Sequence, residues 1–169
     1  MQLILTELSN TFQVRRLHEE DVEEIYTLCK ANKTYYKYFK TEPTHENITE
    51  VLYAAPPGKK SEDKYFLGFF HHDHTLVAVL DLIVGYPNPH TAFIGLFMTA
   101  VSEQRQGTGT KIMQDVLKQL AHQGMACVRL GCISGNTEAA SFWKHNGFHP
   151  TGEKTQTAEY RIDLMEKVL

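Results

Sequence analysis

Hydrophobic and polar residues are arranged along the chain in segments that predict both strands and helices. Apolar or alternating runs between turn residues predict strands over 12–16, 65–70, 75–84, 91–98, 125–133, 148–152 and 160–165. Apolar residues spaced three and four positions apart predict helices from about 18 to 29 and over 45–53, 108–122 and 137–146. This order of elements predicts a single α/β domain over residues 1–169, with a mixed sheet of about six or seven strands.

The composition is that of a globular protein with a hydrophobic core of its own. Hydrophobic residues make up 42% of the 169 residues and charged residues 22%, which excludes a disordered, collagen-like or coiled-coil chain. The apolar runs are too short to cross a bilayer, and residues 1–10 lack the basic start of a signal peptide. We therefore expect no association with a membrane.

Charge and cysteine content narrow the partners and the compartment. The net charge is −3, whereas proteins that bind nucleic-acid phosphates are usually basic, so we expect no nucleic-acid partner. The three cysteines, Cys29, Cys127 and Cys132, form no C-x-x-C pair, and their odd number argues against a disulfide framework. These features favour a reducing compartment, and we expect a cytoplasmic protein.

The turn at residues 104–110 carries the most informative pattern, because it joins a predicted strand to a predicted helix. Backbone N–H groups converge at such a helix start, and glycines there let an anion approach closely. Gln104, Gly107 and Gly109 fit the spacing Q-x-x-G-x-G. Ile112 stands where a Walker A loop or a dinucleotide fingerprint requires a glycine. Taken alone, the turn also fits an ordinary glycine-rich connection that binds nothing.

A second motif runs from Asn136 to Phe148, with a spaced alanine, the aromatic pair Phe142-Trp143 and a closing Gly-Phe. Together with the glycine turn, it resembles the two signatures of the GNAT superfamily of acyl-CoA N-acyltransferases, in their usual order and spacing. The resemblance covers about residues 12–165. It implies the GNAT fold, in which helices cover both faces of a mixed sheet and two parallel strands splay apart at the cofactor site.

This resemblance implies an acetyl-CoA-dependent N-acetyltransferase that needs no metal. Acetyl-CoA would bind in the wedge between residues 91–99 and 125–133, where freed backbone amides polarise the thioester carbonyl. A primary amine of a small molecule or peptide would attack directly in a ternary complex. The cofactor-binding residues carried onto this sequence are Phe97, Met98, Thr99, Gln104, Arg105, Gln106, Gly107, Thr108, Gly109, Thr110, Asn136 and Trp143.

Two of these residues have alternative interpretations. Asn136 resembles the family's cofactor-contacting asparagine, but it equally suits the N-cap of the following helix. Trp143 stands where many members carry a tyrosine that protonates the leaving thiolate, and it either packs on the pantetheine arm or belongs to the core. An indole cannot act as an acid, so the alternative function is a non-catalytic acyl-CoA-binding or sensing module. A nucleotide-binding protein that uses the glycine turn is a third interpretation.

Asp81 is the candidate general base, because it is the one acid in an otherwise apolar strand next to the expected cofactor strand. Burial would raise its pKa toward the range in which a base works. The alternatives are a structural acid bound to the backbone or to Tyr86, and removal of the proton by water or a nearby histidine. The aromatic segment 35–39 either lines the acceptor pocket or packs. The acceptor and the oligomeric state, a homodimer included, stay open.

Overall fold

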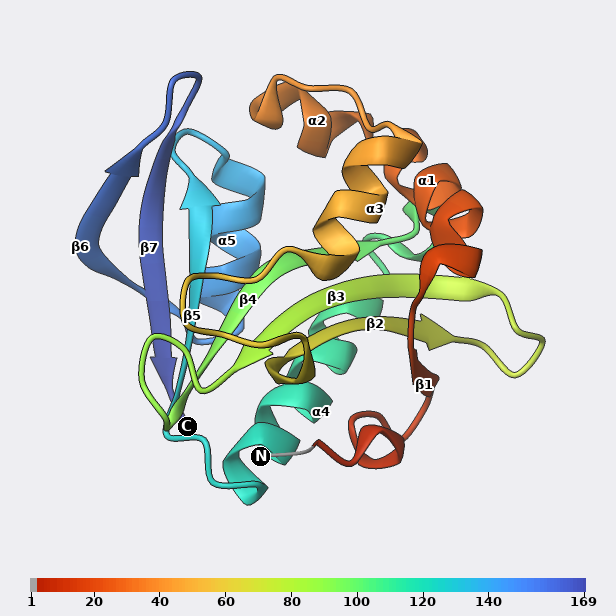
Figure 1. Ribbon diagram of the computed structural model, residues 1–169, viewed down its shortest axis with the longest axis horizontal. Coiled ribbons are helices and arrows are strands. Elements are labelled where there is room, and N and C mark those ends of the chain that lie inside the picture. Colours follow the sequence, from red (N-terminus) through yellow and green to blue (C-terminus); the bar gives the residue numbers. More distant parts are fainter. Residues whose placement is uncertain (1–2) are drawn as a thin grey trace.

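A seven-stranded sheet, in the order β1-β2-β3-β4-β5-β7-β6, forms the centre of the molecule (Figure 1). The computed structural model describes residues 3–169. Strands β4 and β5 are parallel, and the other neighbouring strands are antiparallel. The strands are β1 (Gln13–Arg16), β2 (Lys64–Phe70), β3 (Leu76–Val84), β4 (Thr91–Thr99), β5 (Cys127–Ile133), β6 (His149–Gln156) and β7 (Arg161–Val168).

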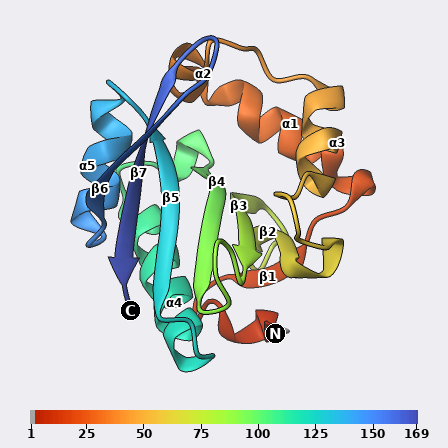
Figure 2. The same cartoon turned by 60° about the vertical axis from the view of Figure 1, so that its left-hand side comes forward.

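Helices cover both faces of this sheet, as Figure 2 shows. Helices α1 (Val22–Ala31) and α3 (His45–Tyr53) bury Ile, Leu and Cys side chains in an apolar cluster on one face. Helices α4 (Thr108–His122) and α5 (Thr137–His145) pack into the larger cluster on the other face. The predicted architecture of a mixed sheet with helices on both faces is confirmed. Between residues 3 and 169, no helix combines the length and apolar character needed to span a membrane.

Sequence periodicity explains the two helices that flank β5. The apolar face of α4 lies against the sheet because its large apolar residues recur three and four positions apart. Helix α5 ends at His145, and Gly147 follows its C-cap with a φ of +87°, the left-handed conformation that the sequence predicted for this glycine. The residues that α4 buries are Ile112, Met113, Val116, Leu117 and Leu120.

One helix was not predicted. The sequence pattern indicates two helices between β1 and β2, but the structure has three, because residues Lys33–Phe39 form the short helix α2. Its aromatic residues have no strong helical preference, and packing holds them in place. Tyr35 stacks on Phe39, one turn later, with ring centroids 5.8 Å apart. Lys40, at φ 56°, closes the helix with a left-handed residue.

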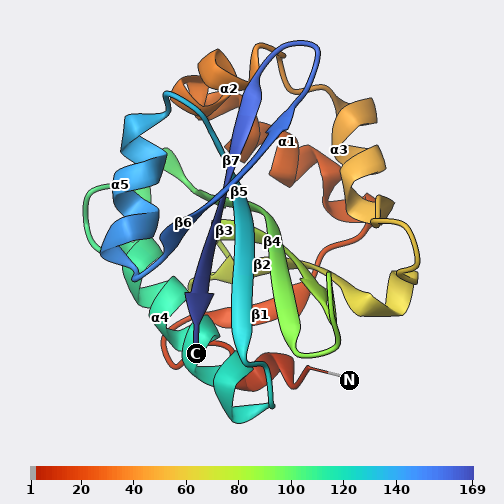
Figure 3. The same cartoon turned by 90° about the vertical axis from the view of Figure 1, so that its left-hand side faces the viewer.

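The parallel strands β4 and β5 separate halfway along their length. They pair only from Thr91 opposite Cys127 to Ile94 opposite Leu130. Beyond this point β4 continues beside β3 alone, while β5 continues beside β7 (Figure 3). The separation begins at Gly95, an extra residue that bulges out of the β3–β4 pairing. The wedge that the family resemblance implies is therefore present.

Candidate active site

A cleft of about 490 Å³ opens where β4 and β5 separate. The end of β4, the glycine turn, the start of α4, helix α5 and the junction of α1 with α2 form its walls. Of the predicted cofactor residues, Gln106 and Thr108 do not line this cleft; their side chains bond Ser102 and Glu103 instead. Those that line it are Phe97, Met98, Thr99, Gln104, Arg105, Gly107, Gly109, Thr110, Asn136 and Trp143.

The glycine turn presents main-chain N–H groups to the cleft. Arg105 and Gly107 adopt left-handed conformations, with φ of 60° and 80°, and α4 begins directly after them. The N–H groups in the first turn of a helix have no acceptor within that helix and lie at its positive end. A Cβ on Gly109 would come within 3.3 Å of the Phe142 ring and 3.4 Å of the Thr99 methyl group. The turn therefore suits an anion that approaches closely.

The free edge of β4 supplies further donors. The N–H of Ala100 donates to Val77 of β3 at 2.7 Å. Because alternate residues of an antiparallel pair bond the same neighbour, Met98 also directs its N–H toward β3. The N–H groups of Phe97 and Thr99 point the other way, into the wedge. Of the three backbone donors predicted here, the geometry thus leaves two for a ligand, and the N–H of Met98 belongs to the sheet.

Asn32 is a buried polar residue at the cleft that the sequence motifs do not mark. Its amide nitrogen donates to the carbonyl oxygens of Leu28, at 2.9 Å, and Thr99, at 3.1 Å. Its Oδ1 accepts a hydrogen bond from the Gln104 side chain at 2.6 Å. Asn32 therefore ties α1 to the end of β4 and to the glycine turn. No local pattern identifies it, because these partners lie far away in the sequence.

The structure resolves the alternative interpretations of Asn136 and Trp143 in part. Asn136 accepts the N–H of Ala139 at 3.1 Å, so its predicted role as the N-cap of α5 is confirmed. Trp143 is only 8% exposed and packs among the rings of Phe97, Phe142 and Phe148. It belongs to the larger core cluster and also forms part of the cleft wall.

A second cavity, of about 640 Å³, lies on the other side of the wedge. Strands β4 and β5, the β6–β7 hairpin and α2 form its walls. The aromatic segment 35–39 lines it through Tyr35 and Phe39, together with Tyr86, Phe93 and Tyr160. The cleft and the second cavity meet at five residues that line both: Tyr35, Phe97, Asn136, Ala139 and Trp143.

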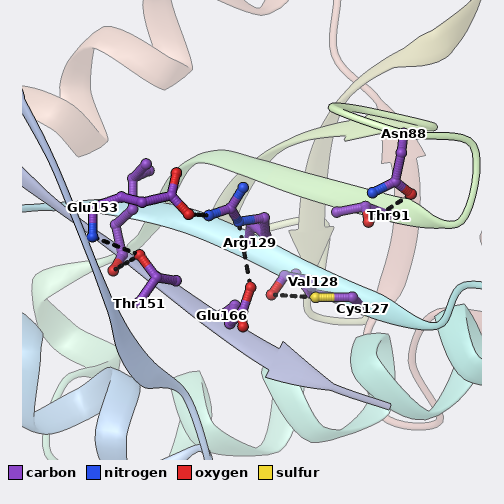
Figure 4. Close-up of polar contacts among 9 residues, drawn as sticks. Asn88, Thr91, Cys127, Val128, Arg129, Thr151, Glu153 and Glu166 are labelled. Atoms are coloured by element: carbon purple, nitrogen blue, oxygen red, sulfur yellow. Dashed lines mark hydrogen bonds and ion pairs between the residues drawn. The ribbon is translucent and has the colours of Figure 1, made fainter.

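The charged side chains that line the second cavity, within the part of the chain described, are Arg129 of β5 and Glu153 of β6. They form an ion pair with each other, as Figure 4 shows. On its other side, the Arg129 Nε lies 3.5 Å from the Glu166 carboxylate. The guanidinium is therefore held between two carboxylates, and the cavity's own charges are balanced within its walls.

Asp81 is buried in β3, in a bidentate ion pair that the sequence did not reveal. Both of its carboxylate oxygens lie 2.8 Å from the Lys64 ammonium of β2, and both residues are under 10% exposed. Burial raises the pKa of the Asp81 carboxyl, and the Lys64 charge opposes that rise. A Cβ on Gly95 would lie 2.6 Å from Asp81 Oδ2. The carboxylate thus sits directly beneath the β4 bulge, whose Gly95 lines the second cavity.

Among residues 3–169, no group of three or more His, Cys, Asp or Glu side chains is placed to hold a metal ion. The cleft combines splayed parallel strands, a glycine turn at a helix start and a second cavity that meets it. These features define an acyl-CoA-dependent N-acyltransferase. The model of the acetyltransferase (GNAT) family matches residues 19–148, and the chain belongs to this family. No curated protein sequence gives a significant match.

Solved acetyltransferases share the fold. An acetyltransferase from Thermus thermophilus superposes with a TM-score of 0.73 at 17% identity, over 94% of this chain and 97% of the other. The PaiA N-acetyltransferase of Thermoplasma acidophilum, in complex with coenzyme A, gives 0.68 at 20% identity, over 94% and 99%. An aminoglycoside acetyltransferase in complex with coenzyme A gives 0.72 at 15% identity, over 94% and 95%.

Proposed function

We propose that this chain transfers the acetyl group of acetyl-CoA directly to a primary amine, with both substrates bound at once. The observation that carries this proposal is the separation of β4 from β5 at a place where two cavities meet. One cavity offers main-chain donors to an acyl-CoA, and the other offers a largely apolar chamber to an acceptor. A direct attack needs both substrates in contact, and the junction supplies the place.

Acetyl-CoA binding is assigned to the cleft. The N–H groups at the start of α4 would receive the pyrophosphate, with the Arg105 side chain nearby to neutralise charge. The N–H groups of Phe97 and Thr99 would bond the pantetheine arm and the thioester oxygen. Fixed donors of this kind stabilise the negative charge that develops on a carbonyl oxygen during attack.

The acceptor is assigned to the second cavity. Aromatic and aliphatic side chains dominate its lining, and its two charged residues, Arg129 and Glu153, neutralise each other. An apolar surrounding disfavours an ammonium and so increases the share of the neutral amine, which is the form that attacks. We therefore propose an acceptor with a single primary amine on an apolar body, small enough to enter a chamber of about 640 Å³.

Asp81 stays our candidate for the proton acceptor. Its carboxylate lies beneath Gly95, which separates it from the second cavity, so a proton would have to reach it through water. The ion pair with Lys64 lowers the basicity of the carboxylate, whereas burial increases it. Removal of the amine's proton by water alone is the competing route, and the variants discussed below distinguish the two.

The experiment that tests this function measures amine-dependent release of CoA with a thiol reagent. Three acceptors share one primary amine and differ only at the far end: hexylamine, 1,6-diaminohexane and 6-aminohexanoate. We expect hexylamine to give the highest kcat/KM, because a charged far end would lose hydration in an apolar chamber. Control reactions without amine correct for the thiol reagent that reacts with the free cysteines Cys29, Cys127 and Cys132.

The free thiols also lead us to propose that the protein works in a reducing compartment, the cytoplasm.

The outcomes separate the candidate functions. CoA release that requires an amine supports the acetyltransferase. Tight binding of acetyl-CoA without release, across acceptors of every charge, would instead support a sensing module, which the tryptophan at position 143 favours. Higher activity with 1,6-diaminohexane than with hexylamine would keep the enzyme but overturn the proposed class of acceptor.

A further inference from the structure

Five residues line both cavities, and the acetyl group must pass between the two substrates at these residues. They are Tyr35, Phe97, Asn136, Ala139 and Trp143. Phe97 and Ala139 carry hydrocarbon side chains only. Asn136 uses its Oδ1 to cap α5. Tyr35 is the member of this set that carries a hydroxyl, and it reaches the junction from α2, on the side opposite α5.

Aromatic packing fixes the Tyr35 ring. It stacks on Phe39, at an interplanar angle of 19°, and meets Tyr36 edge-on with ring centroids 5.0 Å apart. Phe39 in turn contacts Tyr160 of the β6–β7 connection, at 5.3 Å. Figures 2 and 3 show α2 and this connection side by side, above the separating strands. A phenol held between two elements in this way can keep a defined position beside a ligand.

The Tyr35 hydroxyl is available to a ligand. It makes no hydrogen bond to any residue from 3 to 169. The neighbouring Tyr36 differs, because its hydroxyl lies beside the Cys29 thiol and its ring lines neither cavity. The hydroxyl is not fully enclosed by protein, and its residue lines both cavities. A substrate bound at their junction can therefore accept its hydrogen bond.

We propose that the Tyr35 hydroxyl donates a hydrogen bond to the sulfur of CoA as the thioester breaks. The inference rests on the proposed function and adds a catalytic residue to it. The amine nitrogen attacks the carbonyl carbon and forms the C–N bond, and its proton leaves through water, to Asp81 or to solvent. The C–S bond then breaks, and its electron pair leaves on the sulfur. The thiolate departs hydrogen-bonded to Tyr35 and takes a proton from solvent once released.

Acidity explains why Tyr35 donates a hydrogen bond rather than its proton. Burial raises the pKa of the Tyr35 phenol, and the nearby Tyr160 adds to the rise. The ordinary pKa of a phenol, about 10, is no lower than that of an alkyl thiol, and burial raises that of Tyr35 further. The departing sulfur is therefore the weaker base, and the proton stays on the oxygen. A hydrogen bond from a neutral hydroxyl to an anion is still among the stronger ones in proteins.

The test uses CoA itself, so it does not depend on knowing the acceptor. The pKa of the bound CoA thiol is measured from the ultraviolet absorbance of the thiolate during a pH titration. The difference between the CoA complex and the acetyl-CoA complex cancels the absorbance of the protein. We expect the thiol pKa to be about one unit higher in Tyr35→Phe than in the wild type, because one charge-assisted hydrogen bond is lost.

Tyr36→Phe is the matched control, because it removes a hydroxyl one residue away that faces Cys29 rather than the cavities. The pKa of the CoA thiol bound to Tyr36→Phe should equal that of CoA bound to the wild type. A second measurement supports the first: above the thiol pKa, preference for CoA over acetyl-CoA should fall about 10-fold in Tyr35→Phe, since one pKa unit is one factor of ten. Phenylalanine keeps the ring that packs on Phe39 and Tyr36, so Tyr35→Phe should fold like the wild type.

Three results would contradict either the role of Tyr35 or the proposed acetyltransferase function, and they distinguish the two. Equal thiol pKa values in the wild type and Tyr35→Phe would overturn the role of Tyr35 while leaving the acetyltransferase intact. A rise in Trp143→Phe but not in Tyr35→Phe would make the indole N–H the donor and also overturn it. Failure of the wild type to bind either CoA or acetyl-CoA would overturn the proposed function itself.

Discussion

Trp143 is enclosed by three aromatic rings at the junction of the two cavities, and its substitution separates packing from chemistry. Because an indole does not release a proton, we expect Trp143→Phe to lower kcat by less than about 10-fold, a modest effect beside the usual contribution of an acid–base group. Trp143→Tyr should match or exceed the wild-type kcat, because it adds an ionisable hydroxyl. Steady-state kinetics with hexylamine measures both.

A loss above about 100-fold in Trp143→Phe, with normal acetyl-CoA affinity and thermal stability, would show that the indole takes part in the chemistry, since such a loss is typical of a lost acid–base group. The thermal midpoint is the necessary companion measurement, because Trp143 is also a core residue. A less stable variant with reduced activity reports on packing and not on catalysis.

The buried Asp81–Lys64 pair yields a prediction about stability. Asp81→Asn leaves the Lys64 charge buried without a counter-ion, and breaking a buried pair in this way costs about 3–5 kcal/mol. We expect the thermal midpoint to fall by roughly 10 °C in a protein of this size. The double variant Lys64→Met/Asp81→Leu removes both charges and should recover most of that loss, because paired apolar replacements are often neutral.

The same double variant tests proton transfer. If Asp81 accepts the amine's proton, kcat/KM should fall about 10²–10⁴-fold in both Asp81→Asn and the double variant, and the loss should shrink at high pH, where more of the amine is neutral. A stable double variant with wild-type kcat/KM at neutral pH would exclude Asp81 as the base. It would also confirm the ion pair as a purely structural feature.

At the scale of elements, the start of α4 is the most sensitive place for the acyl donor. A side chain on Gly109 would project toward Phe142 and Thr99, into the cleft wall. We expect Gly109→Val to weaken acetyl-CoA binding at least ~10-fold, or about 1.4 kcal/mol, by calorimetry. Lys111→Val, an exposed position of the same helix outside the cleft, should bind normally. If the two folded variants bind acetyl-CoA with equal affinity, the glycine turn does not bind acetyl-CoA as proposed.

The connection between β1 and α1 predicts a response to acid. The Asp21 carboxylate accepts two bonds from Arg15, at 2.7 and 2.9 Å, and one from the His18 N–H at 2.8 Å. The Arg15 guanidinium beside it lowers the pKa of the Asp21 carboxyl. Because the folded pKa lies below the ordinary value, the ionised carboxylate stabilises the protein above about pH 4, and this stability is lost as the pH falls through the folded pKa.

We therefore expect Asp21→Asn to lose about 1 kcal/mol of unfolding free energy at pH 7, a modest value because Arg15 is half exposed. The difference from the wild type should shrink as the pH falls below the ordinary aspartate pKa of about 4 and then through the lower folded pKa, where the carboxylate is protonated. Urea unfolding at pH 7 and in acid measures it. A difference that persists unchanged in acid would mean that the asparagine disturbs the turn itself.

Periodicity and motif spacing predicted most elements for clear physical reasons. Helix α4 is recognisable because five of its residues repeat at the helical period and face the core. Helix α2 is not, since its Phe39 packs against Tyr160, a contact that no local window contains. The strands β6 and β7 extend beyond their predicted ends, into exposed or half-buried and mostly polar residues that show no alternation.

At the scale of the whole molecule, the sequence predicted the wedge and the glycine turn but not what surrounds them. Both signatures lie on elements that are contiguous in sequence, so their order alone positions them. Asn32, Lys64 and Arg129 join the site through partners between 17 and 72 positions away. Such pairings depend on strand register and helix docking, which a single sequence does not display.

The cleft and the second cavity meet at the junction but have largely different walls. Helix α4 and the glycine turn border only the first, and the β6–β7 hairpin borders only the second. If each substrate occupies the cavity assigned to it above, neither has to pass the other's position to reach the junction. This predicts random-order addition of the two substrates. In steady-state kinetics, double-reciprocal plots should give intersecting lines when either substrate is varied, and CoA should inhibit competitively against acetyl-CoA but not against the amine. Each substrate should also bind the free enzyme on its own in calorimetry.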